Sequence, residues 1–205
     1  MGRPVSRQRI EISPGAAFLA ALLFYCLRQE ELLALGLAVL SHELGHGAAI
    51  LLLGQRLTGF RAELGGFRLD YAGDAAPWGH GLIAAAGPLA GLAWAYAASL
   101  LGNRLGQSWL CLSAGMALVL NLFNLLPAEP LDGGRILAPL LTAAMGERRA
   151  AILMDGLSIG SAVGILALGG VAGCRGKGAG LLAVGAWLLF SAVRGLGLVK
   201  TGKIR

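Results

Sequence analysis

A pair of histidines beside a glutamate is the feature of this sequence that most directly suggests chemistry. His42, Glu43 and His46 form the pattern His-Glu-Leu-Gly-His. On a helix, side chains at positions i and i+4 lie on one face, so the two imidazoles can bind one metal ion. The adjacent carboxylate can then accept a proton from a water molecule at that metal. The pattern predicts a zinc-dependent hydrolytic site, and a buried polar network that only stabilises helix packing is the alternative.

A catalytic zinc ion needs a third protein ligand, because such sites combine three side chains with one water molecule. The segment 121–135 reads NLFNLLPAEPLDGGR. Its two prolines end the preceding helix, and Gly133-Gly134 allows a sharp turn. Asp132 is therefore presented on irregular backbone, which membranes tolerate only where it faces protein or water. We expect Asp132 to meet the two histidines toward the cytoplasmic side.

The composition places these residues in a membrane protein. Of 205 residues, 56% are hydrophobic and 14% are charged, and the mean hydropathy is +0.70. Soluble domains contain about 25% charged residues, so a soluble globular protein is excluded, and the high hydrophobicity excludes a disordered chain. Several apolar runs approach the roughly 20 residues that cross a bilayer. The predicted fold class is an all-α polytopic membrane protein.

Six apolar runs predict about six transmembrane helices. They cover residues 14–27, 32–53, 81–101, 108–126, 151–173 and 179–199, and a half-length helix covers 136–145. The first run follows several arginines, as in a signal peptide, but no small-x-small cleavage site precedes Arg28. We therefore expect the first helix to be retained.

The 17 basic residues orient the chain in a cell membrane. If both termini are cytoplasmic, 13 basic residues lie on or near the inside, and Arg28, Arg104, Arg175 and Lys177 lie outside. Short cytoplasmic loops carry an excess of Lys and Arg, so cytoplasmic termini are predicted. These loops account for the net charge of +6, and we predict no nucleic-acid binding. The three cysteines have neither an even count nor CxxC spacing, so no disulfide framework or cysteine zinc site is indicated.

Residues 58–73 predict a β-hairpin, because polar and apolar residues alternate on both sides of Gly65-Gly66. The predicted register pairs Phe60 with Tyr71, Ala62 with Leu69, Leu64 with Phe67, Arg61 with Asp70, and Glu63 with Arg68. All the apolar residues then share one face, which can rest against the bilayer. Either edge of the hairpin, Phe60–Leu64 or Phe67–Tyr71, could accept an extended substrate strand. A hairpin that merely connects two helices is the alternative.

The two spaced motifs resemble those of a known family, the site-2 intramembrane zinc metalloproteases. That family combines HExxH in one transmembrane helix with Asn-x-x-Pro-x-x-x-x-Asp-Gly in another. The second pattern falls on Asn124, Pro127, Asp132 and Gly133, and residues 84–89, AAAGPL, resemble a stretch of the intervening helix. Many relatives have Asn where this chain has Gly91. The resemblance covers a core of about 32–137 within a single predicted domain, 1–205, whose accessory helices lie at about 14–27 and 151–199.

The resemblance implies one Zn²⁺ per chain, with His42, His46 and Asp132 as ligands and Glu43 as the catalytic base. It suggests that Asn124 binds the substrate backbone, although Asn124 could equally satisfy carbonyl groups freed by Pro127. The implied substrate is a membrane-tethered protein, cleaved in or near its transmembrane segment to release a regulatory protein.

The chain is most similar to the short branch that contains the sporulation protease acting on a membrane-tethered sigma-factor precursor. We expect no CBS domain, which that branch often carries. A regulatory membrane protein is a further expected partner. Among other intramembrane enzymes, prenyl-protein endopeptidases also bury HExxH, but the Asp132 segment fits the site-2 pattern better.

Two functions of other classes also fit a buried metal site. One is a metal-ion transporter, which needs further polar residues along its path, and Asp155 is one of few such residues in the remaining helices. The other is an inactive scaffold that keeps zinc for folding.

Overall fold

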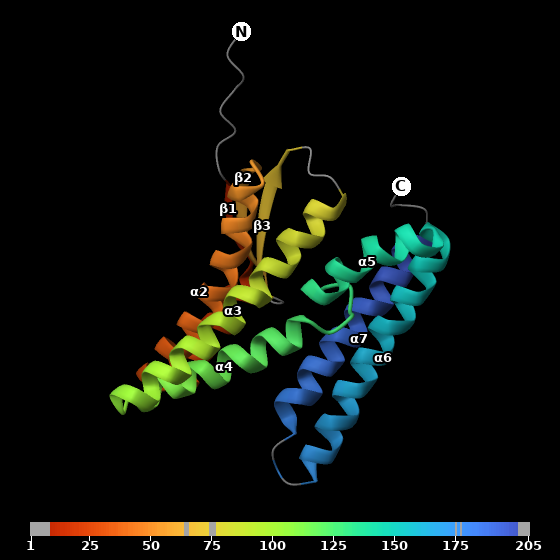
Figure 1. Cartoon of the computed structure of the whole chain (residues 1–205). Coiled ribbons are helices and arrows are strands. Elements are labelled where there is room, and N and C mark those ends of the chain that lie inside the picture. The colour runs from red at the N-terminus through yellow and green to blue at the C-terminus, as the bar shows by residue number, and fades with distance from the viewer. Residues whose placement is uncertain (1–8, 64–65, 74–76, 175, 177, 201–205) are drawn as a thin grey trace. The chain divides into compact units, whose positions relative to one another are not determined.

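The computed structural model describes residues 9–63, 66–73, 77–174, 176 and 178–200 (Figure 1). The chain divides into two compact units, Met1–Phe123 and Asn124–Arg205. The elements that begin in the first unit are β1 (Arg9–Ile12), α1 (Pro14–Cys26), α2 (Gln29–Leu52), β2 (Arg56–Glu63), β3 (Gly66–Ala72), α3 (Pro77–Leu105) and α4 (Ser108–Asn124). Those of the second unit are α5 (Asp132–Met145), α6 (Glu147–Gly173) and α7 (Ala179–Lys200).

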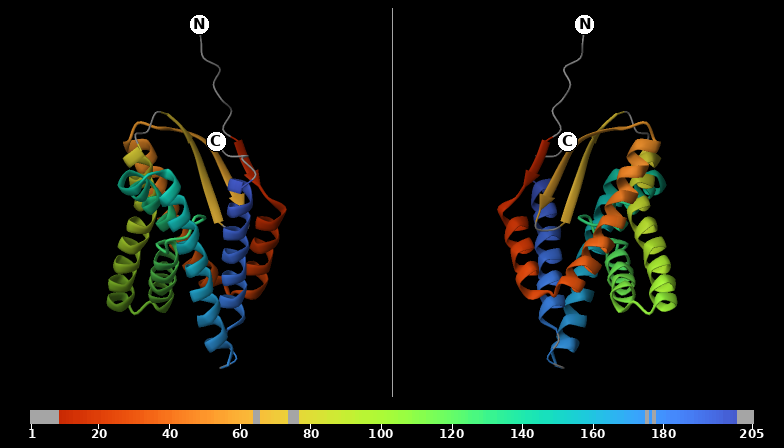
Figure 2. Two further views of the ribbon diagram at one scale, coloured as in Figure 1. Left: turned by 90° about the vertical axis from the view of Figure 1, so that its right-hand side faces the viewer. Right: turned by 90° about the vertical axis from the view of Figure 1, so that its left-hand side faces the viewer.

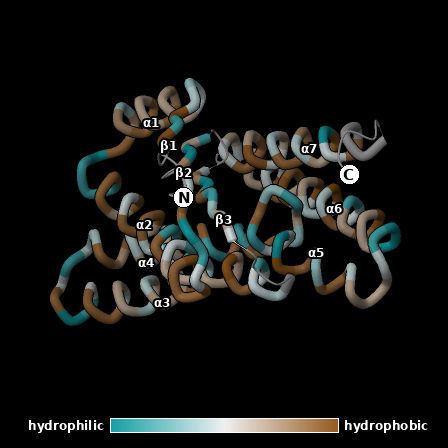
Figure 3. Tube along the Cα trace, turned by 90° about the horizontal axis from the view of Figure 1, so that it is seen from above, coloured by the Kyte–Doolittle hydropathy of each residue, from teal (hydrophilic) through white to brown (hydrophobic). Residues whose placement is uncertain are grey.

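The predicted membrane helices are all present as helices, and the polytopic helical fold class is confirmed. Four are long and apolar enough to cross a membrane, namely Gln29–Leu52, Trp78–Leu105, Glu147–Gly173 and Ala179–Leu196. The helices α1 and α4 have 13 and 17 residues. At 1.5 Å per residue α1 is about 20 Å long, which is less than the roughly 30 Å of the hydrocarbon core. Length and composition therefore support four of the six predicted crossings. Figure 3 shows hydrophobic residues along most of the helices.

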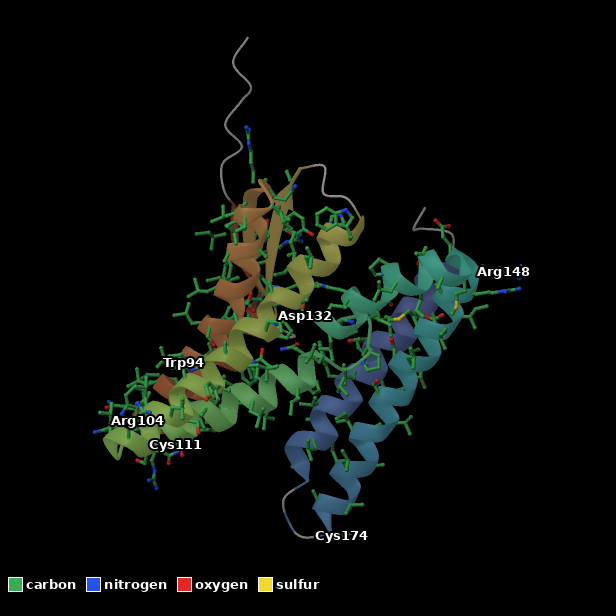
Figure 4. All side chains as sticks on the ribbon, in the orientation of Figure 1. Trp94, Arg104, Cys111, Asp132, Arg148 and Cys174 are labelled. Atoms are coloured by element: carbon green, nitrogen blue, oxygen red, sulfur yellow. The ribbon has the colours of Figure 1, made fainter. Side chains whose placement is uncertain are left out.

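The first unit is organised around α2, α3 and α4, with α3 antiparallel to the other two (Figure 1). The Ser113 hydroxyl on α4 donates a hydrogen bond of 2.9 Å to the Ala34 carbonyl on α2, and the Trp94 indole on α3 donates one of 3.0 Å to Ser113. Figure 4 shows Trp94 on α3 beside the neighbouring helices. The packed surfaces consist of small residues, including Ala38 and Ala117. Small residues allow the close helix approach on which membrane helix packing depends.

The predicted hairpin is confirmed as β2 and β3, but its register and turn differ from the prediction. Phe60 lies opposite Leu69, Ala62 opposite Phe67, and Glu63 opposite Gly66, so the turn lies one residue earlier than predicted. The residues between the strands, 64–65, lie outside the described residues, as does the predicted Leu64–Phe67 pair. This shift keeps every side chain on its predicted face, which is why the alternation could not distinguish the two registers. The observed register stacks the rings of Phe60 and Phe67, whose centroids are 5.2 Å apart.

The charge pairing across the hairpin is only partly as predicted. Arg61 lies directly opposite Arg68 and not Asp70. Its guanidinium still reaches Asp70 diagonally, with two hydrogen bonds of 2.7 Å from Nε and Nη2 to the carboxylate. The predicted Glu63–Arg68 opposition does not occur, because Glu63 pairs with Gly66. These bonds lower the pKa of Asp70 and raise the pKa of Arg61.

The sheet has a third strand that was not predicted from the sequence, and this strand covers one of the two edges of the hairpin. β1 pairs in parallel with β2, with Ile10 opposite Phe60, and the strand order is β1-β2-β3 (Figure 2). β2 is therefore the central strand, and the prediction that the Phe60–Leu64 edge could accept a substrate strand is wrong. The outer edge of β3, Phe67–Tyr71, is compatible with the prediction. A parallel pair needs a long crossover, which α1 and α2 provide here.

The second unit consists of α5, α6 and α7, and α6 and α7 form an antiparallel hairpin (Figure 1). An added Cβ at Gly169 would contact Leu182, and one at Gly185 would contact Leu166, so glycines allow the two helices to approach closely. Gly156 and Gly160 are spaced like a small-residue packing pair, but an added Cβ at either would have no atom of the described residues within 4 Å. Close packing of these two helices therefore uses Gly169 and Gly185.

We predict that Asp70→Asn weakens the hairpin at neutral pH, because the amide cannot form the charge-assisted pair with Arg61. Since the pKa of Asp70 is lowered in the folded protein, its stabilising contribution is complete above the ordinary Asp pKa of about 4. The contribution is lost as the pH falls through the lower folded value. Hydrogen exchange of β2 and β3 amides should therefore be faster in the variant at pH 7, and the difference should vanish in strong acid.

Arg68→Gln is the matched control, because Arg68 lowers the pKa of Asp70 through its charge alone and less than Arg61 does. Its effect on exchange should be much smaller. Equal effects of the two variants at pH 7 would contradict a specific role of the Arg61–Asp70 pair.

Candidate metal centre

The two histidines of the HExxH pattern lie on one face of α2, as predicted. His42 and His46 are 5% and 9% exposed, and their Nε2 atoms are 3.1 Å apart. The rings meet edge to face, with centroids 4.7 Å apart. This places two nitrogen ligand atoms side by side within a helix whose other residues are mainly apolar.

Each imidazole is oriented through its second nitrogen. His46 Nδ1 lies 2.7 Å from the Ile83 carbonyl oxygen on α3, and His42 Nδ1 lies 2.8 Å from Asn121 Oδ1 on α4. Both partners are oxygens that only accept, so each Nδ1 must carry the hydrogen in the neutral ring. Each Nε2 then presents a lone pair, and the two Nε2 atoms cannot hydrogen-bond to each other.

This arrangement fits a metal ion. Two nitrogens bound to one tetrahedral zinc at 2.0–2.1 Å would lie about 3.3 Å apart, close to the observed Nε2 separation. Histidine ligands of metals characteristically donate the other N–H to a carbonyl or carboxylate, as these rings do to oxygen acceptors. The pair therefore has the spacing and the tautomers of two zinc ligands.

The glycine of the AAAGPL stretch makes room for this pair. A Cβ at Gly87 on α3 would collide with the His46 imidazole, at Nε2, Cε1 and Cδ2. On the same interface, a Cβ at Gly45 would collide with the Ala86 carbonyl oxygen and Ala90. The small residues at these positions thus allow α3 to lie directly against the histidine face of α2.

Asp132 lies in the second unit, at the first position of α5, where it is 6% exposed. Gly133 and Gly134 follow it because a Cβ at either would collide with backbone carbonyl groups of Leu125 or Ala128. The prediction that Asp132 lies on irregular backbone with a sharp turn at these glycines is wrong, because residues 132–134 form the first turn of α5 and the irregular segment is 125–131. Glycine is needed at both positions for close approach and not for a positive φ. Arg135 Nη1 lies 3.9 Å from Asp132 Oδ1. Figure 4 labels Asp132 at the start of α5.

The other two predicted site residues occupy intermediate positions. Glu43 is half-buried on α2, next to His42, and Asn124 is half-buried at the last position of α4. The third histidine, His80, lies near the start of α3 with Nδ1 2.6 Å from the Tyr71 hydroxyl oxygen.

Two groups that orient the histidines were not identified from the sequence. Ile83 contributes only its backbone, so its side chain gave no signal. Asn121 did give a signal, because an amide within an apolar helix is expensive unless it has a defined partner. No role was assigned to it from the sequence. The family pattern drew attention instead to Asn124, one turn later.

Comparisons with known proteins agree with these observations. The sequence pattern of Peptidase M50B-like proteins matches residues 15–129, and that of Peptidase family M50 matches residues 103–168. A Synechocystis protein that carries the provisional name of a zinc metalloprotease is 31% identical over 137 residues, which cover 64% of this chain and 36% of that protein. The chain thus spans about a third of the length of this curated relative.

The fold is similar to that of the site-2 protease from Methanocaldococcus jannaschii. The TM-score is 0.68 at 20% identity, and the match covers 95% of this chain and 93% of that structure. At this identity the similarity concerns the fold, while the M50B-like match extends over more than half of the sequence. The chain therefore belongs to the Peptidase M50B-like family and has a site-2 protease fold.

Proposed function

We propose that the protein is an intramembrane zinc metalloprotease that cleaves a membrane-tethered protein in or near its transmembrane segment. The observation that carries this proposal is the buried His42–His46 pair, with both Nε2 atoms 3.1 Å apart and both Nδ1 atoms bonded to acceptors. Membership of a peptidase family supports the same chemistry. Buried imidazoles on a membrane helix are expensive, so they indicate function.

We further propose that Asp132 completes the ligand set of a single Zn²⁺. Together the three side chains offer two imidazole nitrogens and one carboxylate oxygen, a donor set typical of catalytic zinc. In this proposal residues 1–205 act as one protease domain.

The chain's own residues supply the proton transfers of the proposed reaction. When bound, zinc acidifies a water molecule and polarises the scissile carbonyl. Glu43 accepts the proton of the attacking water and later donates it to the leaving amine, so no net proton is consumed. Asn124 hydrogen-bonds the backbone of the substrate. The role of Glu43 is assigned from the family motif and from its position next to His42, and that of Asn124 from the family motif alone.

The substrate must unwind locally, because the peptide bonds of an intact helix are shielded. We propose that cleavage releases a regulatory protein, for which a sigma-factor precursor is one candidate, and that a regulatory membrane protein can control access. Both termini are proposed to be cytoplasmic, from the distribution of Lys and Arg.

We predict that His46→Ala and Asp132→Ala each weaken zinc binding by more than about 100-fold, because a ligand is lost outright. Zinc content of the purified full-length protein, measured by elemental analysis, checks this. His80→Ala is the matched control, since His80 pairs with Tyr71 and should leave zinc bound. Full zinc occupancy in folded Asp132→Ala would remove Asp132 from the ligand set.

We predict that Glu43→Gln keeps zinc but lowers cleavage by at least about 10²-fold, because the amide cannot accept a proton. The assay uses the protein in liposomes with a panel of membrane-tethered substrates, with and without a chelator. Glu31→Gln is a suitable control on the same helix, because Glu31 accepts a hydrogen bond from the Arg28 backbone N–H at the start of α2, about three turns before His42.

The same preparation separates the alternative functions. Cleavage that a chelator stops supports the protease. Ion flux into the liposomes without cleavage would indicate a transporter, and bound zinc with neither activity would indicate a scaffold. An active Glu43→Gln variant would exclude Glu43 as the base.

We propose that the unwound substrate adds as a strand to the outer edge of β3, where its backbone groups find partners that hydrocarbon lacks. Proline has no backbone N–H and cannot donate a hydrogen bond to an added strand. A proline scan of Phe67–Tyr71 should therefore lower cleavage at the positions whose N–H points away from β2. The same scan of Ile10–Ile12 in β1, at the opposite edge of the sheet, is the control. Unchanged cleavage throughout the β3 scan would contradict strand addition there.

A further inference from the structure

Asn121 is a completely buried amide on α4, with an exposed fraction of 0%. It lies on the same interface as the histidines of α2, in a helix of otherwise mainly apolar residues. An amide at this depth must have its polar groups satisfied. The orientation of this side chain is therefore set by its hydrogen bonds.

The bonds of Asn121 fix which atom faces the histidine. Its Nδ2 donates a hydrogen bond of 2.6 Å to the Ala117 carbonyl, one turn earlier on α4. A carbonyl cannot donate, so the NH₂ group must be the atom facing Ala117. The Oδ1 atom consequently faces His42 Nδ1, at 2.8 Å.

The two histidines differ in what holds them. His46 is held by the Ile83 backbone carbonyl, which no substitution removes. His42 is held by a side chain, so its tautomer depends on the residue at position 121. An acceptor there places the hydrogen on Nδ1 and leaves the Nε2 lone pair beside that of His46.

α3 leaves the space in which this amide lies. A Cβ at Gly91 would collide with Asn121 at Nδ2, Oδ1 and Cγ.

We infer that Asn121 is a positioning residue of the metal centre. Its Oδ1 holds His42 in the Nδ1–H tautomer and thereby keeps Nε2 directed at the metal. Gly91 is the small residue on α3 that makes this placement possible. The inference rests on the proposed function, because it assigns Asn121 a role toward a zinc ion bound by His42.

The test compares three variants of the full-length protein by competition with a chromophoric zinc chelator. Asn121→Leu removes the acceptor at similar volume and should weaken zinc binding about 10- to 100-fold. Asn121→Asp keeps an acceptor and should bind zinc within about tenfold of the wild type. Ser113→Ala is the matched control, since it removes a buried hydrogen-bonding group from α4 that contacts Ala34 and Trp94 but not His42. It should leave zinc affinity unchanged.

A second measurement needs no metal. The chain has only three histidines, so ¹⁵N-histidine labelling gives few signals to assign. The metal-free wild type should show His42 with hydrogen on Nδ1, and Asn121→Leu should show this preference lost for His42 but kept for His46. A merely structural role of Asn121 would move stability without this selective change.

The outcomes separate the inference from the proposed function. Wild-type zinc affinity and an unchanged His42 tautomer in folded Asn121→Leu would overturn the inference while leaving the protease proposal intact. A wild type that binds no zinc would overturn both. If Asn121→Leu does not fold, Asn121→Ala takes its place, because the smaller side chain also lacks the acceptor. Loss of the Nδ1–H preference of His42 with zinc affinity lowered about tenfold or more supports the inference, and wild-type affinity with an unchanged tautomer overturns it.

Discussion

The constraint on which the first unit depends is that polar groups inside apolar helices must find partners within the protein. Two imidazoles on α2 satisfy this with oxygens from two different neighbours, Ile83 on α3 and Asn121 on α4. These bonds reach only if the three helices approach closely. The glycines at positions 45, 87 and 91 therefore serve the chemistry of the site as much as the packing of the helices.

Much of the architecture was predictable because its signals are strong and local. Long apolar runs define membrane helices, and the i, i+4 spacing of His42 and His46 places both on one face of α2. The hairpin was also anticipated, whereas Gly133 and Gly134 lie in the first turn of α5 and not in the predicted sharp turn. Length limited the prediction at α1, where apolar composition suggested a crossing but the helix has only 13 residues.

The features that escaped prediction depend on contacts between distant segments. Alternating residues define the faces of a hairpin but not its register, and here the Phe60–Phe67 stacking accompanies a register that the charges alone did not indicate. β1 is only four residues long, so it carries too little pattern to predict its pairing with β2. The partner of His42 could not be deduced, because it lies 79 residues away on another helix.

The attachment of α4 to α2 has a mechanical consequence. Two hydrogen bonds join the parallel helices, Ser113 to Ala34 and Asn121 to His42, and each links residues 79 positions apart. The two bonds are eight residues, or about 12 Å, apart along the axis. Two bonds at separate heights along the axis together oppose both sliding of α4 along α2 and rotation of α4 about its own axis.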